Sequence, residues 1–292
     1  MRHAQGRFLA SELDDVAPDG ARFHVIPVPY EESVSYGGGT AAGPAAILAA
    51  SDQLELWDGE SAPSDLGIHT APAVDCSGGA EAVLARIEAA TATALSHGGM
   101  PVLLGGEHTV TLGALRALHR QHGRFGPFGV VQFDAHADLR DSYGGTPYSH
   151  AAVMRRAVAD LGLPLFQIGV RALCREEVDC RAALGIGHLD AAALARHGIP
   201  DPLLPPDFPE RIYVTFDVDG LDPSIMPATG TPVPGGLGWY DARRCLELAM
   251  AGRQVLGFDV VELAPMEGFH AADFAAARLV YDIMGLVQRL CR

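Results

Sequence analysis

Acidic and histidine side chains follow directly after two apolar runs of the chain. In the motif FDAHAD (residues 133–138), Asp134, His136 and Asp138 alternate along the segment. In an extended segment this spacing directs the three side chains to the same side. Ionisable groups placed together cost much free energy to bury unless a cation lies between them. Because the preceding run is wholly apolar, the motif predicts a metal site rather than a solvated loop.

A second acidic motif, FDVDGLDP, begins at residue 216 and repeats this alternation with Asp217 and Asp219. Asp222, later in the same motif, is expected to cap the turn and is given no chemical role. A third motif, GGEH, contains paired glycines that let the backbone turn sharply. Its His108 then becomes a candidate ligand at the end of a strand.

The three motifs together supply two imidazoles and four carboxylates, a mixture that suits a divalent ion such as Mn²⁺. Six ligands exceed what one catalytic ion needs, so two ions that share carboxylates fit better. A single Zn²⁺ site is the alternative, although it would leave carboxylates without a role. The predicted metal ligands are His108, Asp134, His136, Asp138, Asp217 and Asp219.

Two further residues are candidates for work on a substrate. His150 comes directly after the loop that follows FDAHAD, residues 139–149. Histidine can protonate a leaving amine near neutral pH. The alternative is a surface histidine at the start of a helix. Glu262 ends the apolar run GFDVVE, and a carboxylate at that depth needs a cationic partner such as a planar guanidinium. Asp259, on the same run, is a candidate to hold the site residues in place from behind.

Apolar runs that alternate with amphipathic stretches position these motifs. The runs show no polar alternation, which is typical of parallel strands covered on both faces. The predicted strands are 23–28, 100–105, 128–133, 165–170, 211–216 and 254–261. The predicted helices are 43–52, 80–97, 109–122, 150–161, 240–252 and 271–290. We therefore predict one domain over residues 1–292, an α/β fold with three layers, doubly wound around a mainly parallel central sheet with helices on both faces.

The composition excludes several classes of function. The net charge of −15 argues against nucleic acid or an anionic membrane as a partner. The chain contains no lysine, which excludes a lysine Schiff base and a P-loop. Five dispersed cysteines without a CxxC pair indicate reduced thiols. Because neither a signal peptide nor a run of membrane-spanning length is present, a cytoplasmic protein is expected.

The ordered motifs GGEH, DAHAD, SH and DVDGLDPS, followed by PATGTPVPGG and DVVELAP, resemble the ureohydrolase family of arginases and agmatinases. The resemblance extends over nearly the whole chain. It implies an arginase-like three-layer fold, two Mn²⁺ per subunit and a homo-oligomer, often a trimer or hexamer. It also implies hydrolysis of a small cationic guanidino substrate to urea and an amine.

The resemblance also implies a role for each site residue. A hydroxide that bridges the metals would attack the guanidinium carbon, and Asp138 would orient it. Glu262 would bind the guanidinium, His150 would pass a proton to the departing amine, and Thr231 in PATGTPVPGG would contact the substrate. One ion would be held by His108, Asp134, Asp138 and Asp217, and the other by His136, Asp134, Asp217 and Asp219.

The segment between DAHAD and SH resembles agmatinases more than arginases, so agmatine, cleaved to putrescine and urea, is the expected substrate. The alternatives are guanidinobutyrate, guanidinopropionate or arginine, because Arg140 and Arg171 could pair with a substrate carboxylate or form structural ion pairs. A non-catalytic metal-binding member of the family is a more distant alternative. A metal amidohydrolase on a related fold, with one Zn²⁺, is another.

Overall fold

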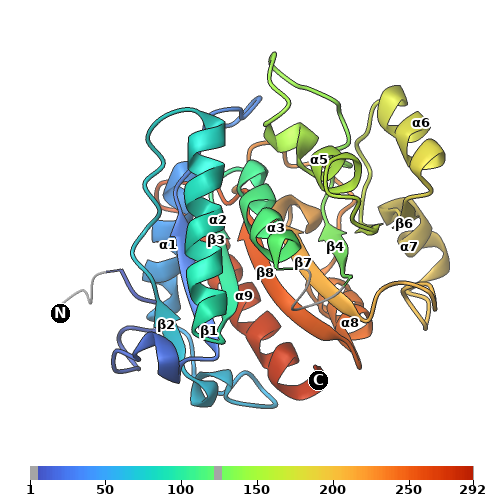
Figure 1. Cartoon of the computed structure of the whole chain (residues 1–292). Helices are drawn as coiled ribbons and strands as arrows, with labels where there is room; N and C mark the ends of the chain where they lie inside the picture. Colours follow the sequence, from blue (N-terminus) through green and yellow to red (C-terminus); the bar gives the residue numbers. More distant parts are fainter. Residues whose placement is uncertain (1–5, 122–126, 292) are drawn as a thin grey trace.

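The computed structural model describes residues 6–121 and 127–291. Within these ranges one sheet of eight strands runs through the molecule in the order β2-β1-β3-β8-β7-β4-β5-β6, and every pairing is parallel (Figure 1). The strands are β1 (Phe23–Val28), β2 (Ile68–Thr70), β3 (Met100–Gly105), β4 (Gly129–Phe133), β5 (Leu165–Ile168), β6 (Gly187–Leu189), β7 (Arg211–Asp217) and β8 (Gln254–Val261).

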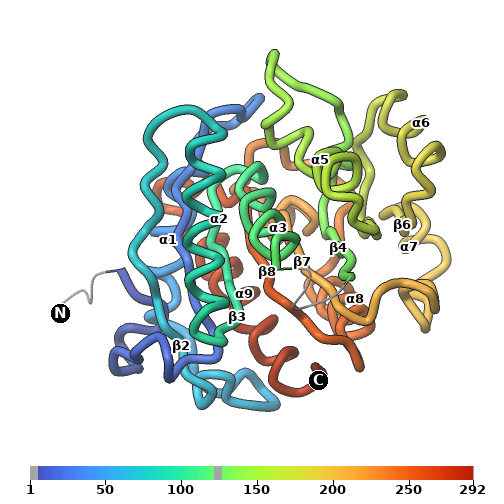
Figure 2. The backbone as a smooth tube through the Cα atoms, viewed as in Figure 1, coloured from blue at the N-terminus to red at the C-terminus, as the bar shows by residue number. Residues whose placement is uncertain are grey.

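Helices cover both faces of this sheet, as the tube in Figure 2 shows. Helices α1 (Gly43–Ser51), α8 (Trp239–Met250) and α9 (His270–Leu290) pack on one face. Helices α2 (Ala80–Ser96), α3 (Thr111–Arg120) and α5 (Val153–Ala159) pack on the other. Two further helices, α6 (Arg175–Leu184) and α7 (Ala191–His197), flank β6 in the chain.

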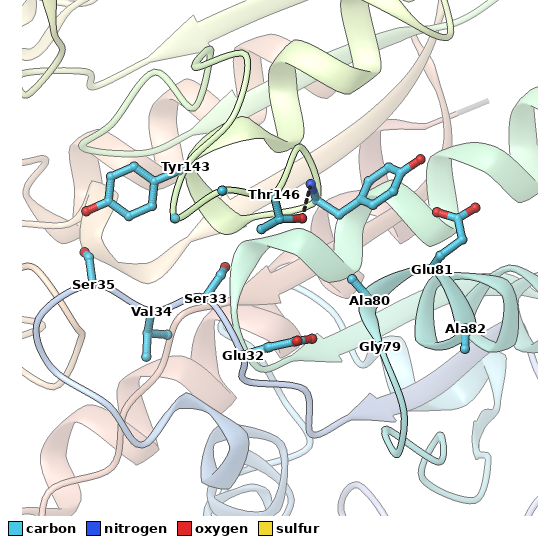
Figure 3. A pocket seen from close by; sticks show the side chains of 13 residues that line it. Glu32, Ser33, Val34, Ser35, Gly79, Ala80, Glu81, Ala82, Tyr143 and Thr146 are labelled. Atoms are coloured by element: carbon cyan, nitrogen blue, oxygen red, sulfur yellow. Dashed lines mark hydrogen bonds between the residues drawn. The ribbon is translucent and has the colours of Figure 1, made fainter.

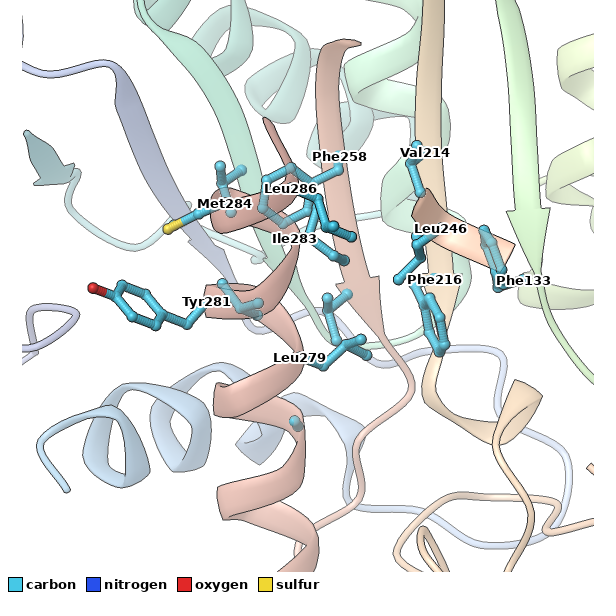
Figure 4. Packing of buried hydrophobic residues seen from close by; sticks show 14 of the residues in the cluster. Phe133, Val214, Phe216, Leu246, Phe258, Leu279, Tyr281, Ile283, Met284 and Leu286 are labelled. Carbon is cyan, nitrogen blue, oxygen red and sulfur yellow. The ribbon is translucent and has the colours of Figure 1, made fainter. Parts of the chain in front are cut away.

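Successive residues of a central strand enter opposite cores, which explains the continuous apolar runs. Val131 and Phe133 of β4 belong to the core under α8 and α9, whereas Val130 belongs to the core under α3 and α5. The rings of Phe133 and Phe216 stack in the first of these cores with centroids 5.0 Å apart (Figure 4). These stacked rings lie one residue before Asp134 and Asp217, so packing fixes the strand ends from which the carboxylates project.

Helix α9 is the longest described helix, and all its residues from 279 to 287 are buried against the sheet and the neighbouring helices α1 and α8 (Figure 4). Among them is Asp282, whose carboxylate is paired with the partly exposed Arg278 at 2.7 Å. Within the described ranges, no helix combines the length and the apolar character that crossing a bilayer requires.

The strand order places four candidate segments at the centre of one sheet edge. Strands β3, β8, β7 and β4 are neighbours in the middle of the sheet, and all run in the same direction. Their carboxyl ends lead into GGEH, Glu262, FDVDGLDP and FDAHAD. Segments far apart in the sequence thus meet where open α/β sheets commonly bind ligands.

The predicted fold class is confirmed, and the sheet is entirely parallel among the described strands. Strands β1, β3 and β8 match their predicted ranges, and β4, β5 and β7 differ by one or two residues at an end. The helix predicted at 150–161 begins with a 3₁₀ turn over His150–Ala152 and ends at Ala159. His122, the predicted last residue of another helix, lies outside the described residues. Strands β2 and β6 and helices α6 and α7 were not predicted.

We predict that Gly113→Ala destabilises the protein although the glycine is in a helix. An added Cβ would lie 2.6 Å from the Cβ of Ile87 and 3.1 Å from the carbonyl oxygen of Leu84, both in α2. Overpacking costs about 1–3 kcal/mol, which exceeds the gain of ~1 kcal/mol in helix propensity. The free energy of unfolding, measured in urea, should fall by about 1–2 kcal/mol. An increase would contradict the close approach of α2 and α3.

Candidate metal and substrate site

The carboxyl ends of β3, β4 and β7 bring His108 together with three carboxylates. Its Nδ1 lies 3.1 Å from Oδ2 of Asp134, 2.9 Å from Oδ2 of Asp138 and 3.5 Å from Oδ2 of Asp217. All four residues are buried. His108, Asp134 and Asp138 form a group whose ligand atoms could hold a metal ion.

A second candidate group contains His136, Asp134 and Asp219, so it shares Asp134 with the first. The Nδ1 of His136 lies 3.0 Å from Oδ2 of Asp219 and 3.6 Å from Oδ1 of Asp134. Backbone amides orient these carboxylates: Ala135 donates to Asp219 at 2.9 Å, and Asp219 donates to Asp217 at 2.8 Å. Asp217 lies beside both groups but is a member of neither.

The pKa values show that these groups need positive charge. Burial and the charge of Asp134 raise the pKa of Asp138 to about 7. Burial and the neighbouring charge of Asp219 raise the pKa of Asp217 well above its usual range. Burial lowers the pKa of His108, but the neighbouring carboxylates of Asp134, Asp138 and Asp217 outweigh it and raise that pKa well above the ordinary value. A proton or a metal cation must therefore compensate the carboxylates.

The hydrogen bond that Nε2 of His108 makes favours a metal ion over a proton at Nδ1 of the same ring. Thr215 donates its hydroxyl to Oδ1 of Asp259 at 2.6 Å, so its oxygen accepts from Nε2 of His108 at 2.8 Å. With the proton on Nε2, the Nδ1 of a neutral imidazole carries a lone pair. This Nδ1 is buried and has no hydrogen-bond partner of acceptable geometry, although carboxylate oxygens lie within 3.5 Å. A lone pair that faces carboxylates fits a metal ligand, so the residues present fit a divalent cation.

Glu262 lies at the same sheet edge as a buried carboxylate. Its Oε1 accepts a hydrogen bond from the backbone N–H of His108 at 2.7 Å. Burial raises the pKa of Glu262 well above its usual range, and among the described residues no ion pair relieves it. Its φ is 65°, a left-handed conformation that is rare for glutamate and is common at functional sites.

Ser33 and Glu107 together hold His150 in one orientation. The Ser33 hydroxyl donates to Oε1 of Glu107 at 2.7 Å, so its oxygen can accept from the backbone N–H and from Nδ1 of His150, each at 3.0 Å. This arrangement assigns the proton of neutral His150 to Nδ1 and leaves Nε2 without one. Burial lowers the pKa of His150, which favours the neutral form.

The paired glycines of GGEH bring the segment of Ser33 to the site. A Cβ on Gly106 would lie 2.0 Å from the carbonyl oxygen of Tyr30, so only glycine permits this approach. The backbone N–H of Glu107 donates to that same oxygen at 2.9 Å, and Oε2 of Glu107 accepts from the N–H of Ser33 at 2.6 Å. Glu107 therefore links the GGEH turn to the loop after β1.

A narrow recess of about 20 Å³ lies among these groups, which is room for about one water molecule. Its lining includes His150, Glu262 and Thr231, together with His136, Asp138, Asp217 and Asp219. A larger cavity of about 440 Å³ shares His150 and Thr231 with it and adds Arg140 and Tyr143. The structure thus brings all the predicted substrate residues to one place.

The two arginines that the sequence left open differ in their surroundings. Arg171 directs its guanidinium at backbone carbonyls, with Nη2 at 2.6 Å from Asp219 and 2.7 Å from Val233. Its Nε and Nη1 also donate to carbonyl oxygens, so no N–H group is left for a substrate. Arg140 lies over the ring of Tyr143 and has no ion pair among the described residues. Asp222 accepts hydrogen bonds from Ser224, which confirms its predicted role in the turn.

Two residues that position the site, Ser33 and Glu107, were not predicted. Ser33 lies in a loop, and no pattern in the sequence identifies it. Glu107 belongs to GGEH, but the motif gives it no role by spacing. Its complete burial beside Ser33 and Thr109 is visible only in the structure.

The model of the Arginase family matches residues 21–285. The chain is 40% identical over 288 residues to an N(1)-aminopropylagmatine ureohydrolase of Synechocystis sp., covering 96% of this chain and 93% of that one. It is 32% identical to an agmatinase of Pyrococcus horikoshii, covering 97% and 98%. The crystal structure of an agmatine ureohydrolase of Thermoplasma volcanium superposes with a TM-score of 0.84 at 30% identity, covering 97% and 96%.

We predict that Asp134→Asn greatly weakens metal binding, because Asp134 belongs to both candidate groups. The apparent affinity for Mn²⁺, measured by equilibrium dialysis with elemental analysis, should fall by on the order of 100-fold. Asp222→Asn is the matched control, because Asp222 belongs to the same motif as Asp217 but holds only the turn. Equal metal binding by wild type and Asp134→Asn would refute the site.

We predict that Ser33→Ala changes the tautomer of His150, because the variant loses the acceptor for the Nδ1 proton. ¹⁵N NMR of histidine-labelled protein should show the Nδ1–H form of neutral His150 in the wild type and an increased Nε2–H form in the variant. Ser35→Ala is the control, since Ser35 lines both cavities that His150 lines but makes no hydrogen bond to it. An unchanged tautomer in Ser33→Ala would contradict the role of Ser33.

Proposed function

The chain belongs to the arginase family and is a hydrolase of the agmatinase type, and from that premise we propose that it releases urea from agmatine or from N(1)-aminopropylagmatine. The relatives described above bear these two substrates in their names. Cleavage of agmatine would leave putrescine, and cleavage of the aminopropyl derivative would leave the correspondingly longer amine. Both substrates present the same guanidino group to the site.

The observation that carries this proposal is the buried carboxylate of Glu262. It lines the recess beside the candidate metal ligands and has no ion pair among the described residues. A guanidinium is planar, keeps its charge, and pairs with a carboxylate through two parallel hydrogen bonds. Bound there, it would relieve the uncompensated charge of Glu262 and hold the guanidino carbon at the recess.

We propose that the site holds two Mn²⁺ ions. His108, Asp134, Asp138 and Asp217 would hold one ion, and His136, Asp134, Asp217 and Asp219 would hold the other. Such ions, when bound, supply Lewis-acid charge and lower the pKa of a coordinated water. The lone pair on Nδ1 of His108 and the shared position of Asp134 support this arrangement. Asp138 lines the recess, from which its carboxylate can orient an attacking water.

His150 is proposed to carry the proton to the departing amine. Because Ser33 engages its Nδ1, the proton is exchanged at Nε2. A neutral imidazole can accept a proton from the attacking water at this nitrogen and then donate it to the amine nitrogen. Thr231, on the wall shared by the recess and the larger cavity, is proposed to contact the substrate.

A guanidino acid such as guanidinobutyrate is the second candidate substrate, and one observation favours it. The guanidinium of Arg140 lines the 440 Å³ cavity and has no ion pair within the described ranges, so it could receive a carboxylate. The engagement of Arg171 by backbone carbonyls supports a structural role for that residue instead.

We propose that the enzyme acts in the cytoplasm as a homo-oligomer, a trimer or hexamer. The five cysteines are all free, which fits a reducing compartment. The oligomer follows from the family resemblance, and size-exclusion chromatography with light scattering tests it.

The test is urea release by the Mn²⁺-loaded protein from agmatine, N(1)-aminopropylagmatine, guanidinobutyrate and arginine. We expect either of the first two to give the highest kcat/KM. Glu262→Gln should lower that kcat/KM by on the order of 100-fold or more, because a buried charge pair is lost. Its bound metal should be unchanged.

Glu267→Gln makes the same chemical change at an exposed position five residues later and should behave as wild type. A preference for guanidinobutyrate would establish the second candidate. No urea from any of the four substrates, with metal bound, would refute both.

A further inference from the structure

We propose that a cavity beside the candidate site binds the protonated amine tail of an elongated guanidine, and that the carboxylate of Glu32 recognises this tail. This inference rests on the proposed function and adds a second binding region to it. The cavity has a volume of about 840 Å³. It lies between the loop after β1, the beginning of α2 and the loop that contains Tyr143 and Tyr148 (Figure 3).

The cavity adjoins the site and shares wall residues with it. Ser35 lines the recess, the 440 Å³ cavity and the 840 Å³ cavity. Val34 lines the recess and the 840 Å³ cavity, and Tyr143 lines both larger cavities. In Figure 3, Ser35 and Tyr143 stand at one end of the 840 Å³ cavity, and Glu32 and Glu81 lie toward the other. A substrate held by its guanidinium at the recess could therefore extend past Ser35 toward these carboxylates.

The two carboxylates of this cavity differ in their availability. Glu81 is paired with Nη1 of Arg116 at 3.0 Å and lies in the first turn of α2, where the helix dipole also compensates its charge. Glu32 is exposed and accepts a hydrogen bond from the hydroxyl of Tyr30, but it has no ion pair among the described residues. An ammonium group that enters the cavity would therefore find its free counter-charge at Glu32.

The neighbouring cavity differs because its wall contains a cation: besides Asp138, a candidate metal ligand, and Glu177, which accepts hydrogen bonds from two backbone N–H groups, it is lined by Arg140. Arg140, which has no ion pair within the described part of the chain, lines the 440 Å³ cavity and would repel an ammonium group. Both cavities adjoin the recess at Ser35, so these two groups would direct a cationic tail toward Glu32 and an anionic tail toward Arg140. The methylene groups of a cationic tail would lie along Val34 and the ring of Tyr143.

This arrangement favours a guanidine with a second, more distant ammonium group. In N(1)-aminopropylagmatine the aminopropyl group adds a terminal amine beyond the amino nitrogen of agmatine. Agmatine is shorter by that group, so its amine ends nearer to the recess. We therefore expect Glu32 to contribute to recognition of the longer compound and to have little influence on the shorter one.

The experiment compares Glu32→Gln with Glu81→Gln, two identical chemical changes in the same cavity. The kcat/KM for urea release is measured with N(1)-aminopropylagmatine and with agmatine, at low and at high salt. Glu32→Gln should lower kcat/KM for the longer substrate by about five- to tenfold, the loss expected for a charge-assisted hydrogen bond. Agmatine turnover should be unchanged, which also shows that the variant is folded.

Glu81→Gln should leave both substrates unaffected, because Arg116 already compensates Glu81. High salt should reduce the wild-type preference for the longer substrate, since an exposed ion pair is screened. The proposal is overturned if Glu32→Gln retains the wild-type ratio of the two kcat/KM values at low salt, or if only Glu81→Gln loses the preference. The absence of urea from both substrates in the wild type would instead refute the proposed function.

Discussion

Four buried aspartates that converge on two histidines at one sheet edge are the constraint on which the rest of the site depends. Ionised carboxylates at this depth repel one another and lose their hydration, so the arrangement is tenable only with compensating positive charge. The protein prepares for that charge in specific ways. Thr215 and Asp259 fix the Nε2 proton of His108, and backbone amides orient Asp219 and Asp217 before any ligand binds.

The backbone around these carboxylates is held in conformations that an isolated chain would avoid. Asp138 and Glu262 have φ values of 53° and 65°, and such conformations cost on the order of 1–3 kcal/mol each. Specific contacts maintain them: the carbonyl of Asp138 accepts from the N–H of Arg155, and the N–H of Glu262 donates to the carbonyl of Gly106. The strain places both side chains at the recess, which a regular continuation of β8 would not do for Glu262.

The elements that bury an apolar face were predictable from sequence, and those held by polar contacts were not. The central strands can be recognised as continuous apolar runs because both of their faces are covered. All three residues of strand β6 are half-buried or exposed, so the strand does not appear in the sequence as an apolar run. Helix α6 lacks a continuous apolar stripe because two of its buried residues are Glu177 and Arg181, which bind the N–H of Leu139 and the side chain of Gln167. Likewise, the six candidate metal ligands follow from motifs, whereas Ser33 acts across 117 residues of sequence.

Arg140 and Arg171 show most clearly where sequence reasoning ends. Arg140 follows β4 and Arg171 follows β5, and nothing in their sequence neighbours separates a substrate-binding arginine from a structural one. The structure separates them by hydrogen-bond saturation: a guanidinium has five N–H groups, and those of Arg171 are directed at carbonyls of the segments around Gly220 and Val233. Arg171 thereby ties the loop after β7 to the wall of the recess, whereas Arg140 keeps its charge available. Under the proposed function, the unpaired charges of Glu32 and Arg140, rather than the metal ligands, would decide which tail a guanidino substrate can carry.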